Sequence, residues 1–226
     1  MKLIIDSADT QAIRKLCEYY PIDGVTTNPS ILNKAGRQPY EVLKEIRQII
    51  GNKDLHVQVV CTKAEDIIAE AEKIRAELGE NTFIKIPVTF EGVKAIKILS
   101  QEKVNCTGTA VYTIEQAYMA AHAGAKWIAP YVNRIENIYG DGIQAVRNMQ
   151  QMLEYNGYDT QIVGASFHRI EQITALMQTG IGAATISAEM LLSLLDNNNV
   201  DSAVENFTKD FEKLCGNGKT MLNGTV

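Results

Sequence analysis

A single lysine stands inside a strongly apolar segment of the sequence. Lys85 interrupts the run Phe83-Ile-Lys-Ile-Pro-Val88, whose composition is typical of a buried strand. A buried ammonium without a partner responds with a lowered pKa, and a neutral amine is the nucleophile that adds to a ketone to form a Schiff base. A structural alternative fits the pattern equally well: a carboxylate such as Asp6 would pair with Lys85 and keep it charged.

A second group of polar residues could bind an anion. Ser166-Phe-His-Arg169 follows an apolar segment and opens a predicted helix. A serine, an arginine and the free amides of a helix N-terminus can together form a phosphate-binding site. The guanidinium of Arg134 would add two further hydrogen-bond donors to the same anion. Arg169 and His168 fit equally well as solvated residues of a first helical turn.

The elements that must position these residues recur along the whole chain. Short β-branched segments begin about every 26 residues on average, with helical spacing between them, which is the pattern of strand–helix units. Thr62-Lys-Ala-Glu65 and Thr113-Ile-Glu-Gln116 predict capping boxes at helix starts. The glycines predicted to end helices are Gly24, Gly51, Gly79, Gly124 and Gly180. The predicted strands are Leu3–Ile5, Val25–Thr27, Val57–Val60, Phe83–Pro87, Val104–Thr109, Trp127–Val132, Ile162–Ser166 and Ala184–Ser187.

Eight such units predict an α/β chain that forms a single (β/α)8 TIM barrel over residues 1–199. An open, doubly wound sheet is the weaker alternative, because Asp6-Ser-Ala-Asp9 after the first strand lacks the glycine-rich phosphate turn of that fold. Residues 200–226 are predicted to form a C-terminal helix and tail rather than a separate domain. The helix would bury its apolar face on its own barrel or on a neighbouring subunit; that face carries Val200, Val204, Phe207, Phe211 and Leu214.

Every predicted strand ends in at least one hydrogen-bonding side chain. In a (β/α)8 barrel the carboxyl ends of the strands meet at one face, where the chemistry takes place. Strand side chains alternate in direction, so residues of one parity share the barrel interior. The sequence therefore predicts a polar pocket formed by Asp6, Thr26, Asn28, Gln58, Lys85, Thr107, Thr109, Tyr131, Asn133, Ser166 and Ser187.

The composition of the chain argues against some classes of binding partner. The chain has 226 residues, of which 46% are hydrophobic, and 27 acidic against 22 basic side chains give a net charge of −5. An acidic balance argues against nucleic acid and anionic membranes as partners. No apolar stretch approaches the roughly 18 residues of a membrane span, and the start of the chain does not resemble a signal peptide.

The sequence offers no spacing typical of a metal site. Its four cysteines are far apart and its three histidines form no ligand pair, so we predict no metal, no disulfide scaffold and a reducing compartment. These residues are Cys17, Cys61, Cys106, Cys215, His56, His122 and His168.

The same residues resemble the motifs of the transaldolase family, and most closely those of its short bacterial members. The resemblance extends in register from the first strand to about residue 190. Its blocks are Asp6, Gly24-Val-Thr-Thr-Asn-Pro-Ser30, Lys85-Ile-Pro-Val, Thr109-Ala-Val, Ala129-Pro-Tyr-Val-Asn-Arg134 and Ala165-Ser166.

The resemblance implies a class I aldolase mechanism in which Lys85 forms a Schiff base without a cofactor. It implies that Gln58, Thr109 and Tyr131 hold a proton-relay water. The binding residues that it implies are Asp6 and Asn28 for sugar hydroxyls, with Thr26 beside them, and Arg134, Ser166 and, less clearly, Arg169 for the phosphate.

Two residues favour one branch of the family. Gln58 and Tyr131 resemble fructose 6-phosphate aldolases, which make or cleave fructose 6-phosphate from dihydroxyacetone and glyceraldehyde 3-phosphate. The alternative is a transaldolase of the pentose phosphate pathway, whose members typically carry glutamate and phenylalanine at these positions. The resemblance also implies a cytoplasmic homo-oligomer built from rings, often a decamer, that acts on small sugar phosphates.

Two rival classes use the same pocket differently. A sugar-phosphate isomerase or epimerase would use Asp6 as base and a charged Lys85 as an electrostatic group. A sugar-phosphate binding barrel would have kept the pocket and lost the chemistry.

Overall fold

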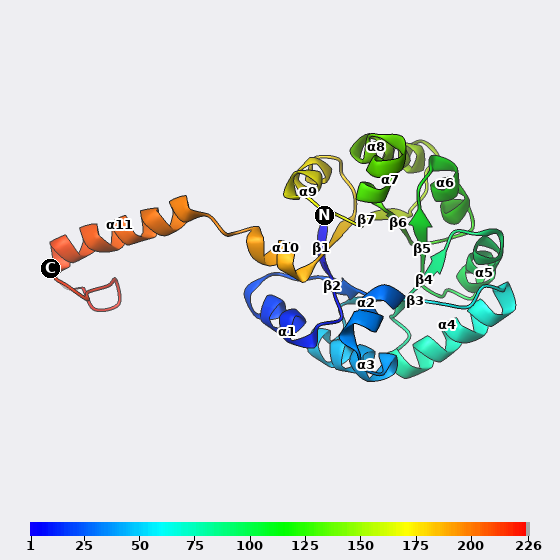
Figure 1. Ribbon diagram of the computed structural model, residues 1–226, viewed down its shortest axis with the longest axis horizontal. Helices are drawn as coiled ribbons and strands as arrows, with labels where there is room; N and C mark the ends of the chain where they lie inside the picture. Colours follow the sequence, from blue (N-terminus) through cyan, green and yellow to red (C-terminus); the bar gives the residue numbers. More distant parts are fainter. Residues whose placement is uncertain (225–226) are drawn as a thin grey trace. The chain divides into compact units, whose positions relative to one another are not determined.

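Eight parallel strands close into a barrel in which each strand pairs with the next and β8 pairs with β1 (Figure 1). The structure, a computed structural model, describes residues 1–224. Closure is direct, since Lys2 of β1 pairs with Ala183 of β8, and this excludes the open sheet. The strands are β1 (Lys2–Asp6), β2 (Gly24–Thr26), β3 (Asp54–Gln58), β4 (Phe83–Pro87), β5 (Cys106–Val111), β6 (Trp127–Pro130), β7 (Gln161–Gly164) and β8 (Ala183–Ile186).

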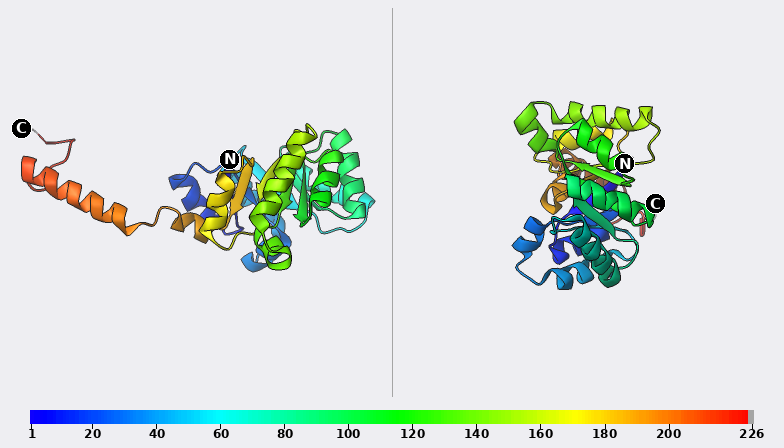
Figure 2. Two further views of the ribbon diagram at one scale, coloured as in Figure 1. Left: turned by 90° about the horizontal axis from the view of Figure 1, so that it is seen from above. Right: turned by 90° about the vertical axis from the view of Figure 1, so that its right-hand side faces the viewer.

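Helices surround the ring of strands (Figure 1, Figure 2). Between successive strands there is usually one helix, whereas two helices follow β2 and two follow β6. The helices of the barrel are α1 (Thr10–Tyr19), α2 (Pro29–Ala35), α3 (Pro39–Ile50), α4 (Ala64–Leu78), α5 (Phe90–Gln101), α6 (Ile114–His122), α7 (Val132–Tyr139), α8 (Gly142–Tyr155), α9 (Ile170–Met177) and α10 (Ala188–Ser193). The prediction of a (β/α)8 barrel is therefore confirmed.

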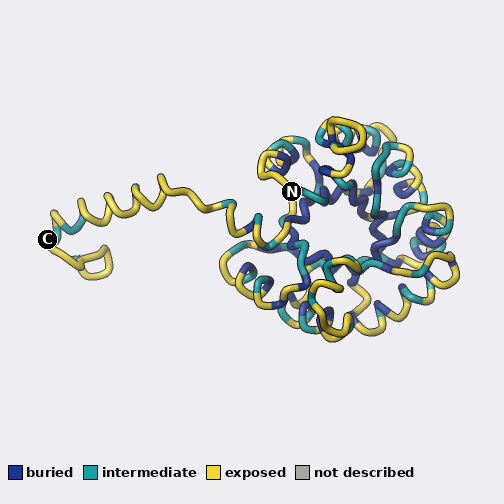
Figure 3. Tube along the Cα trace, viewed as in Figure 1, coloured by how far each residue is buried: buried dark blue, intermediate teal, exposed yellow. Residues whose placement is uncertain are grey.

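Apolar side chains fill both sides of the strands. Side chains such as Ile5, Val25 and Ile84 are fully buried, because alternate strand residues face the surrounding helices. Inside the barrel, Ile4, Trp127, Ala129, Val163 and Ala183 form one buried cluster against Phe83. Figure 3 shows buried residues along the ring of strands. This layer is the floor beneath the carboxyl ends of the strands.

The local helix signals were partly correct. Thr113 caps α6 as predicted, because its hydroxyl accepts from the Gln116 amide at 3.3 Å and the Gln116 side chain accepts from the Thr113 amide at 3.2 Å. The box predicted at Thr62 is wrong: α4 begins at Ala64, whose amide donates at 2.8 Å to Glu91 in the first turn of α5. A carboxylate distant in sequence thus replaces the local cap.

Four of the five predicted helix-ending glycines have the expected positive φ, and Gly24 does not. Gly24 begins β2 instead, and a Cβ there would lie 2.4 Å from the carbonyl oxygen of Asp54 on β3. Close approach of two strands, rather than a turn, explains this glycine.

The chain divides into two compact units, residues 1–191 and 192–226, of which the last two residues lie outside the described part. The first unit holds all eight strands and ends within α10, whereas the sequence predicts a barrel over residues 1–199. The second unit contains α11 (Asn198–Cys215), in which no residue is buried. Across the described residues, no helix is both long and apolar enough to span a membrane.

Candidate active site

A cavity of about 1110 Å³ lies where the strands end and the following loops begin. Its walls come from the ends of β1, β3, β4 and β8 and from the loops after β2, β5, β6 and β7. Most of the predicted polar pocket lies here. The predicted residues that line the cavity are Asp6, Asn28, Gln58, Lys85, Tyr131, Arg134, Ser166 and Ser187.

Lys85 projects from the middle of β4 into this cavity and is only 6% exposed. Its Nζ donates at 2.9 Å to the carbonyl oxygen of Thr27, a neutral acceptor. Among the ion pairs of residues 1–224, none joins Lys85 to a carboxylate within 4 Å. Burial lowers the pKa of Lys85, and the charge of Asp6 opposes this. The geometry therefore favours the amine nucleophile over the ion-paired structural lysine.

Asp6 ends β1 and is held by a chain of hydroxyl groups. The Thr26 hydroxyl donates at 2.7 Å to Oδ1 of Asp6 and lies 2.6 Å from the Thr185 hydroxyl. Because Thr26 has one hydroxyl proton and gives it to Asp6, Thr185 must donate to Thr26. Burial raises the pKa of Asp6, against the charge of Lys85 and the Thr26 hydrogen bond. Thr26 itself does not line the cavity; its hydrogen bond holds the Asp6 carboxylate in place.

Three polar side chains around Lys85 form a second group: Gln58 and Tyr131 line the cavity, whereas Thr109 is fully buried and does not line it. Gln58 pairs in register with Lys85 on the neighbouring strand, and its Oε1 is buried without a hydrogen-bond partner. On the other side of β4, the hydroxyl of Thr109 lies 3.3 Å from that of Tyr131. An unsatisfied buried acceptor is costly, so a water or substrate hydroxyl at Gln58 would be bound favourably. This group can hold and move a proton.

The cation predicted after β6 lies against aromatic rings. The Arg134 guanidinium is 4.7 Å from the centre of the Tyr131 ring and donates at 3.5 Å to the hydroxyl of Tyr112. The hydrogen bond to Tyr112 is the main reason that the pKa of Arg134 is raised. Ser166 lies on the neighbouring loop with a positive φ of 61°. Together Arg134 and Ser166 can hold an anion at this end of the cavity.

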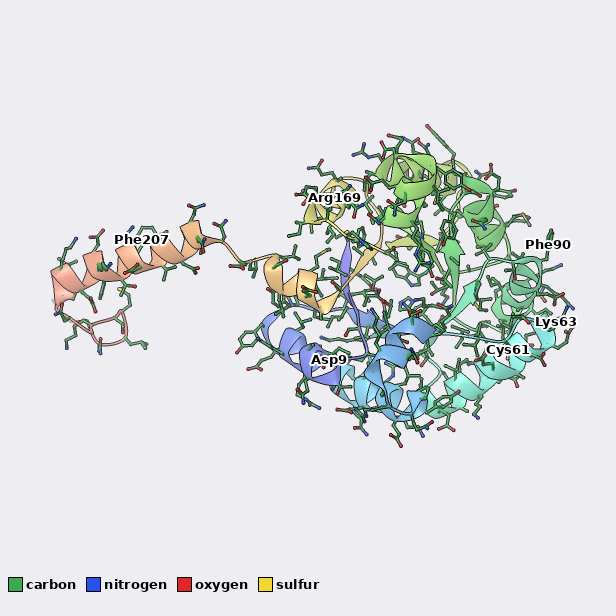
Figure 4. The ribbon with its side chains drawn as sticks, viewed as in Figure 1. Asp9, Cys61, Lys63, Phe90, Arg169 and Phe207 are labelled. Atoms are coloured by element: carbon green, nitrogen blue, oxygen red, sulfur yellow. The ribbon has the colours of Figure 1, made fainter. Side chains whose placement is uncertain are left out.

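Arg169 does not line the cavity. Its guanidinium donates at 2.6 Å to Glu136, which also accepts a hydrogen bond from Gln172. Figure 4 labels Arg169 beside α9. His168 is exposed, as its alternative interpretation as a solvated residue predicted, and it also contributes to the cavity wall. The structure therefore separates Arg169 from Arg134 and Ser166, which it brings together.

The sequence did not predict several of the residues that line the cavity. Tyr112 is one, because the predicted strand ends at Thr109. Lys34 in α2 and Arg37 between α2 and α3 are others. Arg37 is already paired with Glu45 at 2.9 Å. Alternation along the strands could not identify them, since all of them follow a strand end.

Asn133 and Thr107 were predicted to face the pocket, and both are buried away from it. Asn133 accepts from Gln172 at 3.3 Å, and the Thr107 hydroxyl lies 2.9 Å from Nδ1 of His56, one layer below the cavity. No group of three or more potential metal ligands occurs among the described residues. The arrangement is that of a buried amine in a polar cavity, with the exposed cation Arg134 in its wall.

A buried amine at the strand ends of a closed (β/α)8 barrel is the arrangement that an enzyme of the Schiff-base class requires. The chain belongs to the transaldolase/fructose-6-phosphate aldolase family, whose model matches residues 3–222. A probable transaldolase of Symbiobacterium thermophilum is 37% identical to it over 216 residues, which cover 96% of this chain and 99% of that protein. The resemblance found in the motifs is confirmed, and the chain is an aldolase or a transaldolase of carbohydrate metabolism.

Proposed function

We propose that the protein is a class I aldolase that cleaves or forms fructose 6-phosphate through a Schiff base on Lys85. The observation that carries this proposal is the environment of Lys85: a buried amine, hydrogen-bonded to a neutral carbonyl, at the centre of a polar cavity. Desolvation favours the neutral amine, which is the form that attacks a carbonyl.

The chemistry follows from that amine. The Lys85 nitrogen adds to the C2 carbonyl of the ketose, and loss of water gives an iminium. The C4 hydroxyl then loses its proton, the C3–C4 bond breaks, and its electron pair forms an enamine, which releases glyceraldehyde 3-phosphate. Protonation of the enamine at C3 and hydrolysis of the iminium release dihydroxyacetone and restore the amine.

The remaining residues bind, orient and transfer protons. Asp6 and Asn28 hold the hydroxyls of the dihydroxyacetone part, which fixes the reacting carbon. A water held by the second polar group, Gln58, Thr109 and Tyr131, relays the protons.

Arg134 and Ser166 bind the phosphate group of the sugar. Arg169 takes no part in phosphate binding, because it is engaged with Glu136. Thr26 contributes by orienting Asp6.

Transaldolase activity is the second candidate, and the name of the Symbiobacterium thermophilum relative favours it. Gln58 and Tyr131 favour the aldolase. An amide cannot accept a proton as a glutamate would, so the phenol of Tyr131 takes the larger share of proton transfer and promotes protonation of the enamine. Release of dihydroxyacetone then competes with transfer to a second aldose phosphate.

Borohydride trapping tests the proposal. The protein is incubated with fructose 6-phosphate or dihydroxyacetone, reduced, digested and analysed by mass spectrometry. We expect an adduct on Lys85 that is lost in Lys85→Met and kept in Lys94→Met, a lysine exposed on α5 and paired with Glu65. An unmodified protein that still isomerises or binds the sugar phosphate would favour the rival classes.

We further propose a homo-oligomer that acts on small sugar phosphates in the cytoplasm. On α11 the side chains of Val200, Val204, Phe207 and Leu214 are exposed by more than half, and such a patch is typical of an interface. Light scattering should give a mass several times the 25.0 kDa of one chain, whereas a monomer would contradict the proposal.

A further inference from the structure

We propose that Tyr112 is a positioning residue of this site, which holds the anion-binding Arg134 and the proton-transferring Tyr131 in one fixed arrangement. The inference rests on the proposed function for the roles of those two residues. The positioning role of Tyr112 rests on the geometry of β5 and on the contacts among Tyr112, Tyr131 and Arg134.

An irregularity in β5 brings Tyr112 to the cavity. Gly108 pairs with Ile128 and Val111 pairs with Pro130, so three steps along β5 match two steps along β6. The extra residue is a β-bulge, and Ala110 takes a positive φ of 56° within it. Strict alternation from Thr109 would point Val111 inward and Tyr112 toward the helices. Instead Tyr112 lines the cavity.

Tyr112 contacts both of the residues that it positions. Its ring meets that of Tyr131 edge to face, with centroids 5.7 Å apart and an angle of 78° between the planes. Its hydroxyl accepts from Nη1 of Arg134 at 3.5 Å, and the guanidinium lies over Tyr131 at 4.7 Å. Each of the three groups therefore contacts the other two, so that a rotation of one changes the contacts of both others.

The hydroxyl and the ring of Tyr112 act on different partners. The hydroxyl holds the end of Arg134, an exposed and flexible side chain that must be ordered before it grips a phosphate. The ring supports Tyr131, whose own hydroxyl is 3.3 Å from Thr109. Loss of the hydroxyl should therefore affect anion binding, and loss of the ring should also affect proton transfer.

Two variants separate these effects. In aldol addition to dihydroxyacetone, Tyr112→Phe should raise KM for glyceraldehyde 3-phosphate by about three- to tenfold, the range of an ordinary hydrogen bond, because the 3.5 Å bond to Arg134 is long. KM for glyceraldehyde, which lacks the phosphate, should change less than twofold. Tyr112→Leu should in addition lower kcat with both aldehydes.

Tyr118→Phe is the matched control. Tyr118 on α6 makes a similar edge-to-face contact, with Tyr158 at 6.0 Å, but it does not line the cavity. This variant should leave both KM values and kcat unchanged. Thermal unfolding of all three variants separates a local change from a loss of fold.

Binding of inorganic phosphate, measured by calorimetry, tests the arrangement without turnover. Tyr112→Phe should weaken phosphate binding, and Tyr118→Phe should not. Equal changes with both aldehydes, or unchanged phosphate binding in Tyr112→Phe, would overturn the inference. If phosphate binding depends on Tyr112 but the wild-type protein forms no adduct on Lys85, the proposed function is contradicted and the positioning role of Tyr112 is not.

Discussion

Removal of the Tyr131 hydroxyl should separate the two activities of this family. In Tyr131→Phe the enamine still forms on Lys85, but its protonation loses the phenol that prepares the relay water. We expect slower release of dihydroxyacetone and, as a result, more transfer of the bound three-carbon unit to erythrose 4-phosphate.

The contacts of Tyr131 indicate the size of the effect. The hydroxyl makes one long hydrogen bond, 3.3 Å to Thr109, whose loss costs about 0.5 kcal/mol of stability. The ring keeps its contacts with Arg134 and Tyr112, so the fold and the phosphate site should persist. A positioned proton donor contributes about 10²-fold or more to rate, and the water held by Gln58 and Thr109 remains. Cleavage turnover should therefore fall by about 10- to 100-fold.

The assay measures the partition of one enamine between two fates. Fructose 6-phosphate is supplied with and without erythrose 4-phosphate, and the rates of dihydroxyacetone release and of sedoheptulose 7-phosphate formation are compared. Tyr131→Phe should raise the ratio of transfer to release by at least the factor by which release falls. If both rates fall together and the ratio is unchanged, the phenol does not control the branch.

Other substitutions test separate parts of the site. Gln58→Glu restores a base beside Lys85 and should also raise the ratio of transfer to cleavage, as measured in the same partition assay; a lower ratio would refute the role given to the amide. Arg134→Leu should raise KM for glyceraldehyde 3-phosphate by about 10- to 100-fold and change that for glyceraldehyde far less; equal increases would refute its role in phosphate binding. Burial lowers the pKa of His56 well below its ordinary value. As pH falls below about 6.5, the unfolded chain therefore binds a proton that the folded chain does not. The free energy of unfolding then falls by about 1.4 kcal/mol per pH unit. Urea unfolding of His56→Phe should show a shallower acid loss than wild type; an unchanged slope would contradict a neutral His56.

Much of the barrel could be predicted because its signals are local and repeated. Every strand was identified to within a few residues, since β-branched segments and alternation reflect burial on both faces of a parallel sheet. Lys85 could be identified for the same reason: a charged residue inside such a segment has no solvent to face. Thr113 and Gln116 formed the predicted cap because both partners lie within one turn of helix.

What could not be predicted depends on contacts distant in sequence or on a single extra residue. The amide of Ala64 is capped by Glu91, which no pattern around residue 62 could reveal. The bulge at Ala110 reverses the alternation after Thr109, and so Tyr112 was missed. Arg169 follows Ser166 closely enough to suggest a phosphate ligand, but Glu136 on a separate helix pairs with it.

The pH dependence of trapping at Lys85 tests the central claim most directly. With subsaturating dihydroxyacetone and excess borohydride, the rate of adduct formation follows the fraction of Lys85 that is a neutral amine. Burial lowers the pKa of Lys85, so the rate should rise with pH and level off with a midpoint below the ordinary lysine value of about 10.4. A midpoint at or above that value, or an adduct on another lysine, would contradict a buried neutral amine as the nucleophile.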